Sequence, residues 1–396
     1  MILVAFKMLL NDRSKFMGLI FGIAFTSFLA SFAVSYFCGF MTDSFALISE
    51  NKGVDIWVMD PAVSSVEQTI NMDDSALGRV RSIPGVLRAM PLLLGSAEAR
   101  FPNGQFQTFQ IIGVDDATLE GAPTLKNEAS NILRMPDAAI VDEGGTSDKL
   151  LTPIEKADQW PFHRPHLDAP TRMLTKGDEL QIDDHRVLIV GRSSTIPRYP
   201  ATPLLYTTYS NALLWLPPER ENTTFILVTV NSGINASDLA EQISRVTGLR
   251  ARTSTDFIRD TVKWVLINSE DVGDIASMLL MAITVGFGVT GIMLYMFTTE
   301  NLKQYATLSA MGATSKLLIK MIFAQALLAA FIGTGIGLGL CAIIGEMVIA
   351  LSYPFRMMWF TPLAGSFIVV VVSVVAALLS AWPVLKLKPA IIFSQR

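Results

Sequence analysis

The sequence predicts an α-helical membrane protein with four transmembrane helices, one before and three after a large mixed α+β extracytoplasmic domain. Composition is the first observation: 51% of the 396 residues are hydrophobic and 17% are charged, whereas soluble proteins carry about 25% charged residues. Second, the missing charge is concentrated in four uncharged runs, while the middle of the chain has ordinary soluble composition. Third, basic residues gather at one end of these runs.

The four uncharged runs are long enough to cross a membrane. They cover residues 16–40, 275–299, 321–345 and 357–385. Each exceeds the roughly 20 apolar residues that a helix needs to cross a bilayer core, and a helix pairs its own backbone polar groups in lipid. We expect the third helix to cover 321–351, so that Glu346 lies near its outer end in an interfacial role.

Basic residues predict the topology. Those beside the runs are Lys7, Arg13, Lys15, Lys303, Lys316, Lys320, Lys386, Lys388 and Arg396, whereas the loop between the third and fourth runs has only Arg356. The positive-inside rule places both termini and the 300–320 loop in the cytoplasm, and 41–270 outside. A bacterial cytoplasmic (inner) membrane is expected. Ser31-Phe32-Ala33 also permits a cleaved signal peptide, although the run is long for one.

The remaining segments complete the expected layout. Residues 1–15 form a cytoplasmic amphipathic segment or an extension of the first span, and 386–396 form a cytoplasmic tail. The extracytoplasmic domain has two lobes, the second roughly 116–202, a region rich in proline and turn-forming residues. Both cysteines, Cys38 and Cys341, lie in spans, so no disulfide framework is expected outside.

Alternating and helical patterns predict mixed secondary structure in the extracytoplasmic domain. The expected strands are 54–59, 105–114 and 225–230, with a hairpin over 179–191 that turns at Asp183-Asp184. The expected helices are 73–82 and 237–247.

Glycines in the spans indicate helix packing rather than nucleotide binding. The chain has no phosphate-binding loop, and its glycine-rich stretch lies in the third span without a following lysine. The glycines predicted to pack helices closely are Gly333, Gly335, Gly337, Gly339 and Gly286. Small residues at i,i+4 spacing let helices approach each other in lipid. Any ATP and Mg²⁺ must therefore bind to another subunit.

No motif predicts catalysis or metal binding. His163, His166 and Asp168 lie close together, but a metal site needs three or four ligands in a defined geometry, and an ordered loop is the favoured interpretation. Asp142-Glu143 precedes two glycines and indicates a turn rather than paired catalytic carboxylates. We expect a chain that is not an enzyme, with no cofactor, metal or catalytic residue.

The 300–320 loop contains a short amphipathic helix. Leu302, Tyr305 and Leu308 fall on one helical face, and Gly312 can end the helix. One interpretation is a short connecting turn; the other is a docking element for a cytoplasmic partner. The predicted docking residues are Leu302, Tyr305, Leu308, Met311 and Gly312.

Several segments resemble the FtsX-like permease family, which includes MacB-like transporters. The segment 303–314 (KQYATLSAMGAT) resembles the family's sequence between the second and third spans. The tail 382–391 (WPVLKLKPAI) resembles its ending. Ile83-Pro-Gly-Val86, Ile111-Ile-Gly-Val-Asp115 and 239–255 resemble its extracytoplasmic domain. The order of these segments matches over nearly the whole chain.

The resemblance implies a permease subunit of an ABC transporter. It implies a homodimer, a separate ATPase and, in many members, a periplasmic adaptor and an outer-membrane channel. The helix from Leu302 to Gly312 would be the coupling helix on the ATPase, and ATP hydrolysis would move the extracytoplasmic domains. Gln304 and Ser309 stand where the family usually has Arg and Glu, which puts an ionic contact in doubt. Membrane lipids are expected neighbours, and nucleic acid is not.

Three functions are compatible with this layout. The first is export or extrusion of an amphiphilic substrate. The second is a regulatory module of the FtsX type that controls a periplasmic enzyme, although such modules usually have smaller extracytoplasmic domains. The third is a membrane sensor, although sensors usually have a sizeable cytoplasmic output domain and the cytoplasmic segments here are short.

Overall fold

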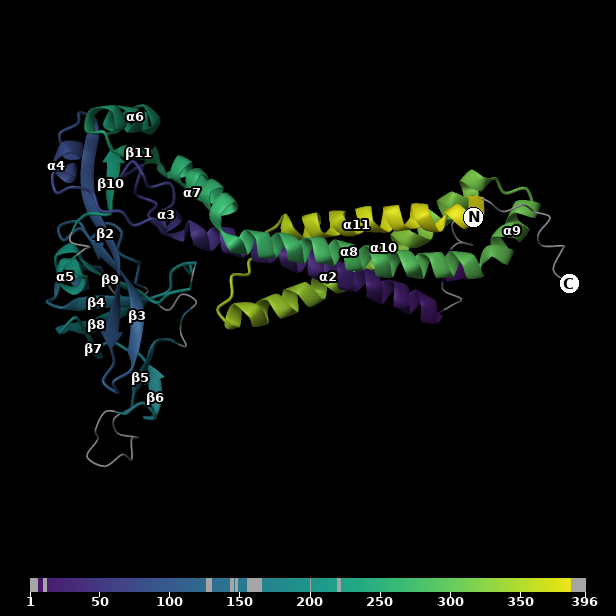
Figure 1. Ribbon diagram of the computed structural model, residues 1–396, viewed down its shortest axis with the longest axis horizontal. Coiled ribbons are helices and arrows are strands. Elements are labelled where there is room, and N and C mark those ends of the chain that lie inside the picture. The colour runs from purple at the N-terminus through teal and green to yellow at the C-terminus, as the bar shows by residue number, and fades with distance from the viewer. Residues whose placement is uncertain are drawn as a thin grey trace. The chain divides into compact units, whose positions relative to one another are not determined.

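The computed structural model describes residues 6–9, 13–125, 130–142, 146, 149–154, 166–199, 201–218 and 222–385 (Figure 1). The chain forms two compact units. The helical unit comprises Met1–Gly39, Glu270–Ala350 and Pro354–Arg396, and the α/β unit comprises Phe40–Ser269 and Leu351–Tyr353. Each unit has its own core.

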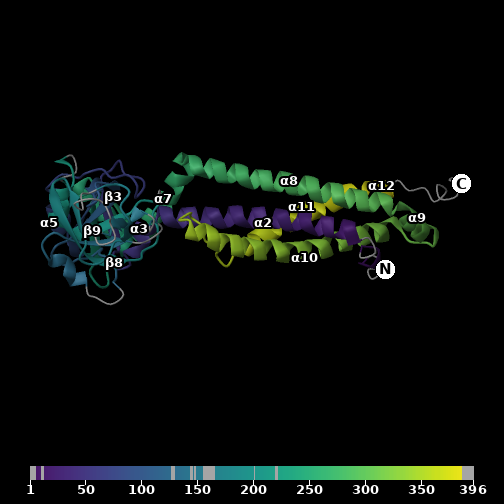
Figure 2. The same cartoon turned by 90° about the horizontal axis from the view of Figure 1, so that it is seen from below.

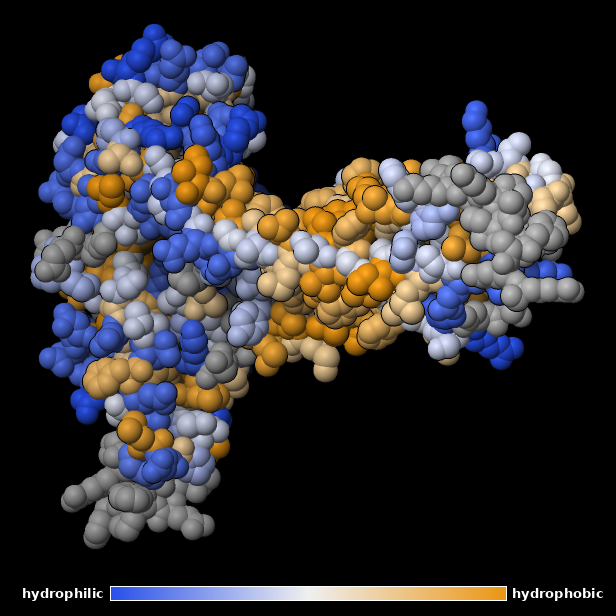
Figure 3. All heavy atoms as spheres, turned by 45° about the vertical axis from the view of Figure 1, so that its right-hand side comes forward, coloured by the Kyte–Doolittle hydropathy of each residue, from blue (hydrophilic) through white to orange (hydrophobic). Residues whose placement is uncertain are grey.

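Four long helices build the helical unit, as Figures 1 and 2 show. They are α2 (Arg13–Ser44), α8 (Glu270–Glu300), α10 (Ser315–Ala350) and α11 (Thr361–Ser380), joined by the short α9 (Leu302–Ala310) and followed by α12 (Trp382–Leu385). Each of the four is long and apolar enough to cross a membrane. Hydrophobic side chains gather over this unit in Figure 3. The predicted four-helix membrane architecture is confirmed.

Helix α2 is the centre of the helical unit. Half of its most apolar stretch (50%) is buried inside the protein, against 17% for α8. Ile23 of α2 lies in the core of the unit with Leu294 of α8 and Ala329 of α10. The other helices therefore pack around α2, and their outward faces remain apolar.

Three of the five predicted packing glycines lie against α2. A Cβ atom on Gly333 would lie 2.7 Å from Ile23, and one on Gly337 would lie 2.5 Å from the carbonyl oxygen of Ala24. A Cβ atom on Gly286 would overlap Thr26. These positions require glycine because the backbones approach too closely for a side chain.

The other two predicted packing glycines face away from α2. Gly335 and Gly339 are exposed, and among the described residues no atom lies within 4 Å of where their Cβ atoms would be. Residues two apart on a helix point to different sides, so Gly333 and Gly337 share the α2-facing side while Gly335 and Gly339 point away. Helix packing through Gly335 and Gly339 stays a prediction.

The α/β unit is built on a nine-stranded sheet of order β11-β1-β10-β2-β3-β9-β4-β8-β7. Its strands are β1 (Ile56–Met59), β2 (Val86–Arg100), β3 (Phe106–Val114), β4 (Ala138–Asp142), β7 (Glu179–Ile182), β8 (His185–Ser193), β9 (Leu204–Thr208), β10 (Phe225–Val230) and β11 (Arg250–Thr253). A separate pair is formed by β5 (Leu151–Pro153) and β6 (Thr171–Met173). The helical elements are α3 (Ala46–Glu50), α4 (Ala76–Arg81), η1 (Ser130–Arg134), α5 (Tyr209–Trp215), α6 (Ala236–Thr247) and α7 (Ser254–Asn268).

The long strand β2 joins two parts of this sheet. Its first half pairs with β10, and its end pairs with β7 through Ala99 and Ile182. Strands β2, β3, β9, β4, β8 and β7 therefore close into a ring. One core cluster fills the ring and includes Phe109, Leu205 and Trp215. Closure removes most free strand edges from this part of the unit.

Two further clusters complete the core. One lies between the sheet, α4 and α6 and includes Val80 and Ile243. The other includes Trp57 of β1, Phe225 of β10 and Phe257 of α7, whose ring centroids are 5.6–5.8 Å apart. Aromatic packing at this spacing stabilises the contact of α7 with the sheet.

The local predictions for this unit hold in most places. Strands β1, β3 and β10 and helices α4 and α6 form within the expected ranges. The hairpin of β7 and β8 turns at Asp183 and Asp184, whose φ angles are +45° and +61°, as such tight turns require. Strands β4, β7, β8 and β9 belong to the same sheet as β2 and β3, whereas β5 and β6 form a separate pair. The limits of a second lobe at 116–202 stay a prediction.

Candidate functional site

The segment between α8 and α10 ends α9 with a defined cap. Gly312 has a φ of +97°, a conformation that glycine adopts without steric cost. Its N–H donates to the carbonyl of Ser309 at 3.0 Å, and the N–H of Ala313 donates to the carbonyl of Leu308 at 3.0 Å. This pair of bonds is a Schellman motif, so Gly312 ends the helix as its sequence predicts.

The apolar side of α9 faces the helical unit itself. Tyr305 has no exposed surface, and its hydroxyl donates a hydrogen bond to Oε1 of Gln325 in α10, with an oxygen–oxygen distance of 2.9 Å. Burial raises the pKa of the Tyr305 phenol to about 12, so it remains a donor. Leu302 and Leu308 are half-buried and pack against the same core.

Tyr305 is therefore corrected from a docking residue to a residue that holds α9 in place. An amphipathic helix buries its apolar stripe on the nearest apolar surface, and here that surface is offered by α8 and α10. Within the predicted docking set, Met311 (71% exposed) and Gly312 remain accessible. The sequence pattern could not distinguish packing inside the chain from docking to a partner, because apolar residues have the same helical spacing in both cases.

The exposed side of α9 carries polar residues that were not among the predicted docking residues. Lys303, Gln304 and Thr307 are exposed on it, and Ala310 and Met311 follow at its end. Gln304 lies on this accessible face, where the family resemblance implied an ionic residue. This surface, named the α9 face, is formed by Lys303, Gln304, Thr307, Ala310 and Met311 and can contact another protein without unpacking the helical unit.

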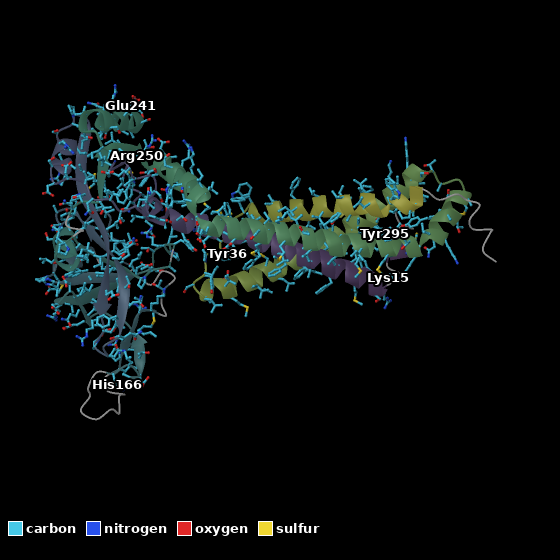
Figure 4. All side chains as sticks on the ribbon, viewed as in Figure 1. Lys15, Tyr36, His166, Glu241, Arg250 and Tyr295 are labelled. Atoms are coloured by element: carbon cyan, nitrogen blue, oxygen red, sulfur yellow. The ribbon has the colours of Figure 1, made fainter. Side chains whose placement is uncertain are left out.

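An ion pair joins the start of α2 to the end of α8, the helix that precedes α9. Lys15 in the first turn of α2 pairs with Glu300 at the end of α8; Lys15 is labelled in Figure 4. Both side chains are partly exposed, at 30% and 48%, so water screens the pair and it contributes less than about 1 kcal/mol.

A buried polar cluster lies in the α/β unit, where sequence patterns gave no signal. Glu50, the last residue of α3, accepts a hydrogen bond from the N–H of Ile196 and another from Nη2 of Arg198 at 2.8 Å. The same Nη2 lies 3.2 Å from the hydroxyl of Tyr206 in β9. Burial raises the pKa of Glu50, and the Arg198 charge and the Ile196 N–H oppose that rise.

The neighbouring carboxylate of Asp142 holds the same segment. Its Oδ2 accepts from the hydroxyl of Ser193 at 2.7 Å and from the N–H of Thr195 at 2.8 Å. Asp142 is 1% exposed at the end of β4. These bonds hold the segment that follows β8 and enclose the Asp142 carboxylate between its donors. Glu143 and the two glycines after it lie outside the described residues.

The described part of the chain shows no metal centre. Groups of three or more His, Cys, Asp or Glu side chains that could hold a metal ion are absent from it. His166 and Asp168 lie beside β6, where Figure 4 labels His166, and His163 falls outside the described residues.

Four membrane helices and a mixed α/β unit define an integral membrane protein with one large non-membrane domain. Residues 276–389 match the family model described as FtsX-like permease C-terminal. The match covers α8 to α12 and includes the α9 face. The resemblance to the FtsX-like permease family inferred from the sequence is confirmed over this segment.

Three solved structures are similar to the chain at low identity. The periplasmic region of MacB from Actinobacillus actinomycetemcomitans matches with a TM-score of 0.36 and 13% identity, over 56% of this chain and 98% of that one. The extracellular domain of the noncanonic ABC-type transporter YknZ from Gram-positive bacteria matches at 0.32 and 10%, over 50% and 98%. A domain of a Porphyromonas gingivalis permease protein matches at 0.30 and 15%, over 52% and 90%. Comparison with curated proteins gave no match.

Proposed function

We propose that this chain is the permease subunit of an ABC transporter that couples ATP hydrolysis by a separate ATPase to movement of its extracytoplasmic domain. The α/β unit is that domain, and the movement exports or extrudes an amphiphilic substrate. The chain lies in a bacterial inner membrane with both termini in the cytoplasm. It works as a homodimer, with a periplasmic adaptor and an outer-membrane channel as further partners.

The observation that carries this proposal is the FtsX-like permease segment at 276–389 together with the accessible α9 face inside it. Basic residues favour the cytoplasmic side for this face, since Lys303, Lys316 and Lys320 lie on or beside it. A docking helix must keep its place under load, and Tyr305 and the Gly312 cap give α9 that rigidity. ATP and Mg²⁺ bind to the partner, because the sequence contains no phosphate-binding loop.

The test measures ATPase activity of the subunit that co-purifies with this chain. Activity is compared in lipid nanodiscs with and without the chain, and again with Met311→Asp. A charge at an exposed apolar contact should weaken docking without unfolding the permease, because Met311 is not part of the core. We expect at least about a tenfold loss of complex formation, which corresponds to about 1.4 kcal/mol.

Met135→Asp is the matched control. Met135 is an exposed methionine (46%) in the α/β unit, remote in sequence from the α9 face. Its variant should bind and stimulate the ATPase like the natural chain. If no ATPase binds the natural chain, the permease function is rejected; if Met311→Asp binds normally, docking through the α9 face is rejected.

A further inference from the structure

Helix α3 carries the chain from the end of α2 into the core of the α/β unit. Leu47 and Ile48 are buried in the cluster that contains Trp57. Asn51 follows α3, and its side-chain amide donates to the carbonyl of Leu47 at 2.7 Å. Because one residue separates α2 from α3, any displacement of the end of α2 must reach α3.

Glu50 is the polar contact of α3 with the opposite side of the unit. It binds Ile196 and Arg198, which are 146 and 148 residues later in the chain. The side chains of Arg198 and Glu50 are 9% and 19% exposed, so neither charge has ready access to water. The second terminal nitrogen of Arg198, Nη1, is buried without a hydrogen-bond partner among the described residues. Arg198 therefore depends on Glu50 for charge compensation.

The segment 193–198 is held at both ends. Asp142 of β4 binds Ser193 and Thr195 at one end, and Glu50 of α3 binds Ile196 and Arg198 at the other. The same segment connects β8 to β9, which lie on either side of β4 in the sheet. Contacts of charged groups with backbone N–H donors are strong and directional. The segment thus links α3 to three strands of the closed ring.

Space beside this link allows it to shift. A cavity of about 320 Å³ lies next to Arg198 and Tyr199 and is also lined by Leu47, Val66 and Gln110. Close-packed cores resist displacement because neighbouring atoms must move together. On the cavity side, Leu47 of α3 and Arg198 border open space rather than close-packed atoms.

We propose that Glu50 and Arg198 are positioning residues that make α3 and the 193–198 segment move together, so that displacement at the end of α2 reaches the ring strands β4, β8 and β9. This inference rests on the proposed function, in which the ATPase cycle moves the extracytoplasmic domain. Without the Glu50–Arg198 pair, α3 keeps only apolar contacts with the ring strands, through a cluster that includes Ile140 of β4 and Leu204 of β9. Apolar contacts are non-directional and let α3 slide against the ring more easily than a hydrogen-bonded ion pair does.

Hydrogen exchange of the full chain with its co-purified ATPase in nanodiscs tests this link. In the natural chain, ATP should change the exchange of peptides that cover α3 and of peptides that cover 193–208. With Glu50→Gln or Arg198→Met, the change in α3 should persist while the change in 193–208 falls at least about twofold. Arg198→Lys retains the positive charge and should restore most of the response.

Two controls separate transmission from simple stabilisation. Glu179→Gln and Arg186→Met remove the same charges from an exposed ion pair on β7 and β8 and should leave both responses intact. Thermal unfolding without ATP is measured in parallel. If Arg198→Met does not fold, Glu50→Gln and Arg198→Lys carry the comparison.

The outcomes differ for the two proposals. If ATP changes nothing in α3 of the natural chain, the proposed function fails and this inference fails with it. If α3 responds but 193–208 does not, or if both variants melt at lower temperature yet transmit fully, the Glu50–Arg198 link is overturned while the permease function stands.

Discussion

At the scale of residues, exposure separates side chains that hold the protein together from those that a partner can reach. Tyr305 and Met311 lie on the same short helix, yet Tyr305 is fully buried and Met311 is 71% exposed. Glu50 and Arg198 are both largely buried and compensate each other's charge. We expect a substitution at a buried residue such as Tyr305 or Glu50 to change stability as well as function. We expect one at the exposed Met311 to change only a contact with another protein.

Asp178 should stabilise the α/β unit at neutral pH and lose that effect in acid. Burial raises its pKa, but hydrogen bonds from Arg172 and from the Thr175 N–H lower it more, so its pKa lies below the usual 3.8. A lowered pKa stabilises the fold above the ordinary value, and the contribution is lost as the pH falls through the lowered pKa. Because Arg172 is 41% exposed and partly screened, Asp178→Asn should cost about 1 kcal/mol at neutral pH.

Thermal unfolding from neutral to strongly acidic pH measures this effect. Asp178→Asn should flatten the acid loss of stability that the natural chain shows. Asp183→Asn is the control, since Asp183 is exposed in the hairpin turn with a φ of +45° that asparagine tolerates. An unchanged acid profile for Asp178→Asn would contradict the assigned role of the Arg172 contact.

At the scale of elements, close approach to α2 determines how helices of the helical unit pack. Gly333 and Gly337 let α10 pack against Ile23 and Ala24, and the opposite side of α10 has no such neighbour in the described chain. Lipid tails are as apolar as leucine, so close packing rather than hydrophobic burial holds such helices together. The α2–α10 crossing is therefore sensitive to a single added methyl group.

Gly337→Ala should destabilise this crossing, and Gly339→Ala should not. Both changes gain about 0.8–1.0 kcal/mol of intrinsic helix propensity, so the comparison cancels that term. The new methyl group at Gly337 overlaps the Ala24 carbonyl and Ser27, and overpacking of this kind costs about 1–3 kcal/mol. Unfolding titrations in mixed micelles should show the difference; equal stability of the two variants would exclude a tight α2–α10 contact.

At the scale of the whole molecule, the two units have separate cores. The buried residues of the three α/β clusters all lie between residues 47 and 257. The buried residues of the helical cluster all lie before or after that range. The sheet of the α/β unit closes on itself through β2 and β7. The buried residues of its three core clusters therefore all come from one continuous stretch of chain.

A fragment of residues 46–268 should fold without the membrane helices. It retains the nine-stranded sheet, α3 to α7 and all three core clusters. Because one nine-stranded sheet runs through all three clusters, we expect a soluble protein with a mixed α/β circular dichroism spectrum and one cooperative thermal transition. A gradual transition, or aggregation at low concentration, would show that the unit needs the helical unit to fold.

The sequence by itself determined the features that depend on local patterns. Uncharged runs predicted the membrane helices, Asp183-Asp184 predicted a hairpin turn, and Gly312 predicted the end of α9. The motif around residues 303–314 indicated the family that the 276–389 match confirms. Each of these signals lies within a few turns of helix or a few strand residues, where neighbouring side chains and backbone geometry are sufficient.

Only the tertiary structure decided which neighbour each element meets. It placed Tyr305 inside the helical unit, turned Gly335 and Gly339 away from α2, closed the ring of strands, and joined Glu50 to Arg198 across 148 residues. Periodicity states which residues share a face but not whether that face meets lipid, a partner or the same chain. That choice depends on contacts between segments far apart in sequence, because burial is decided by the surface that happens to be opposite.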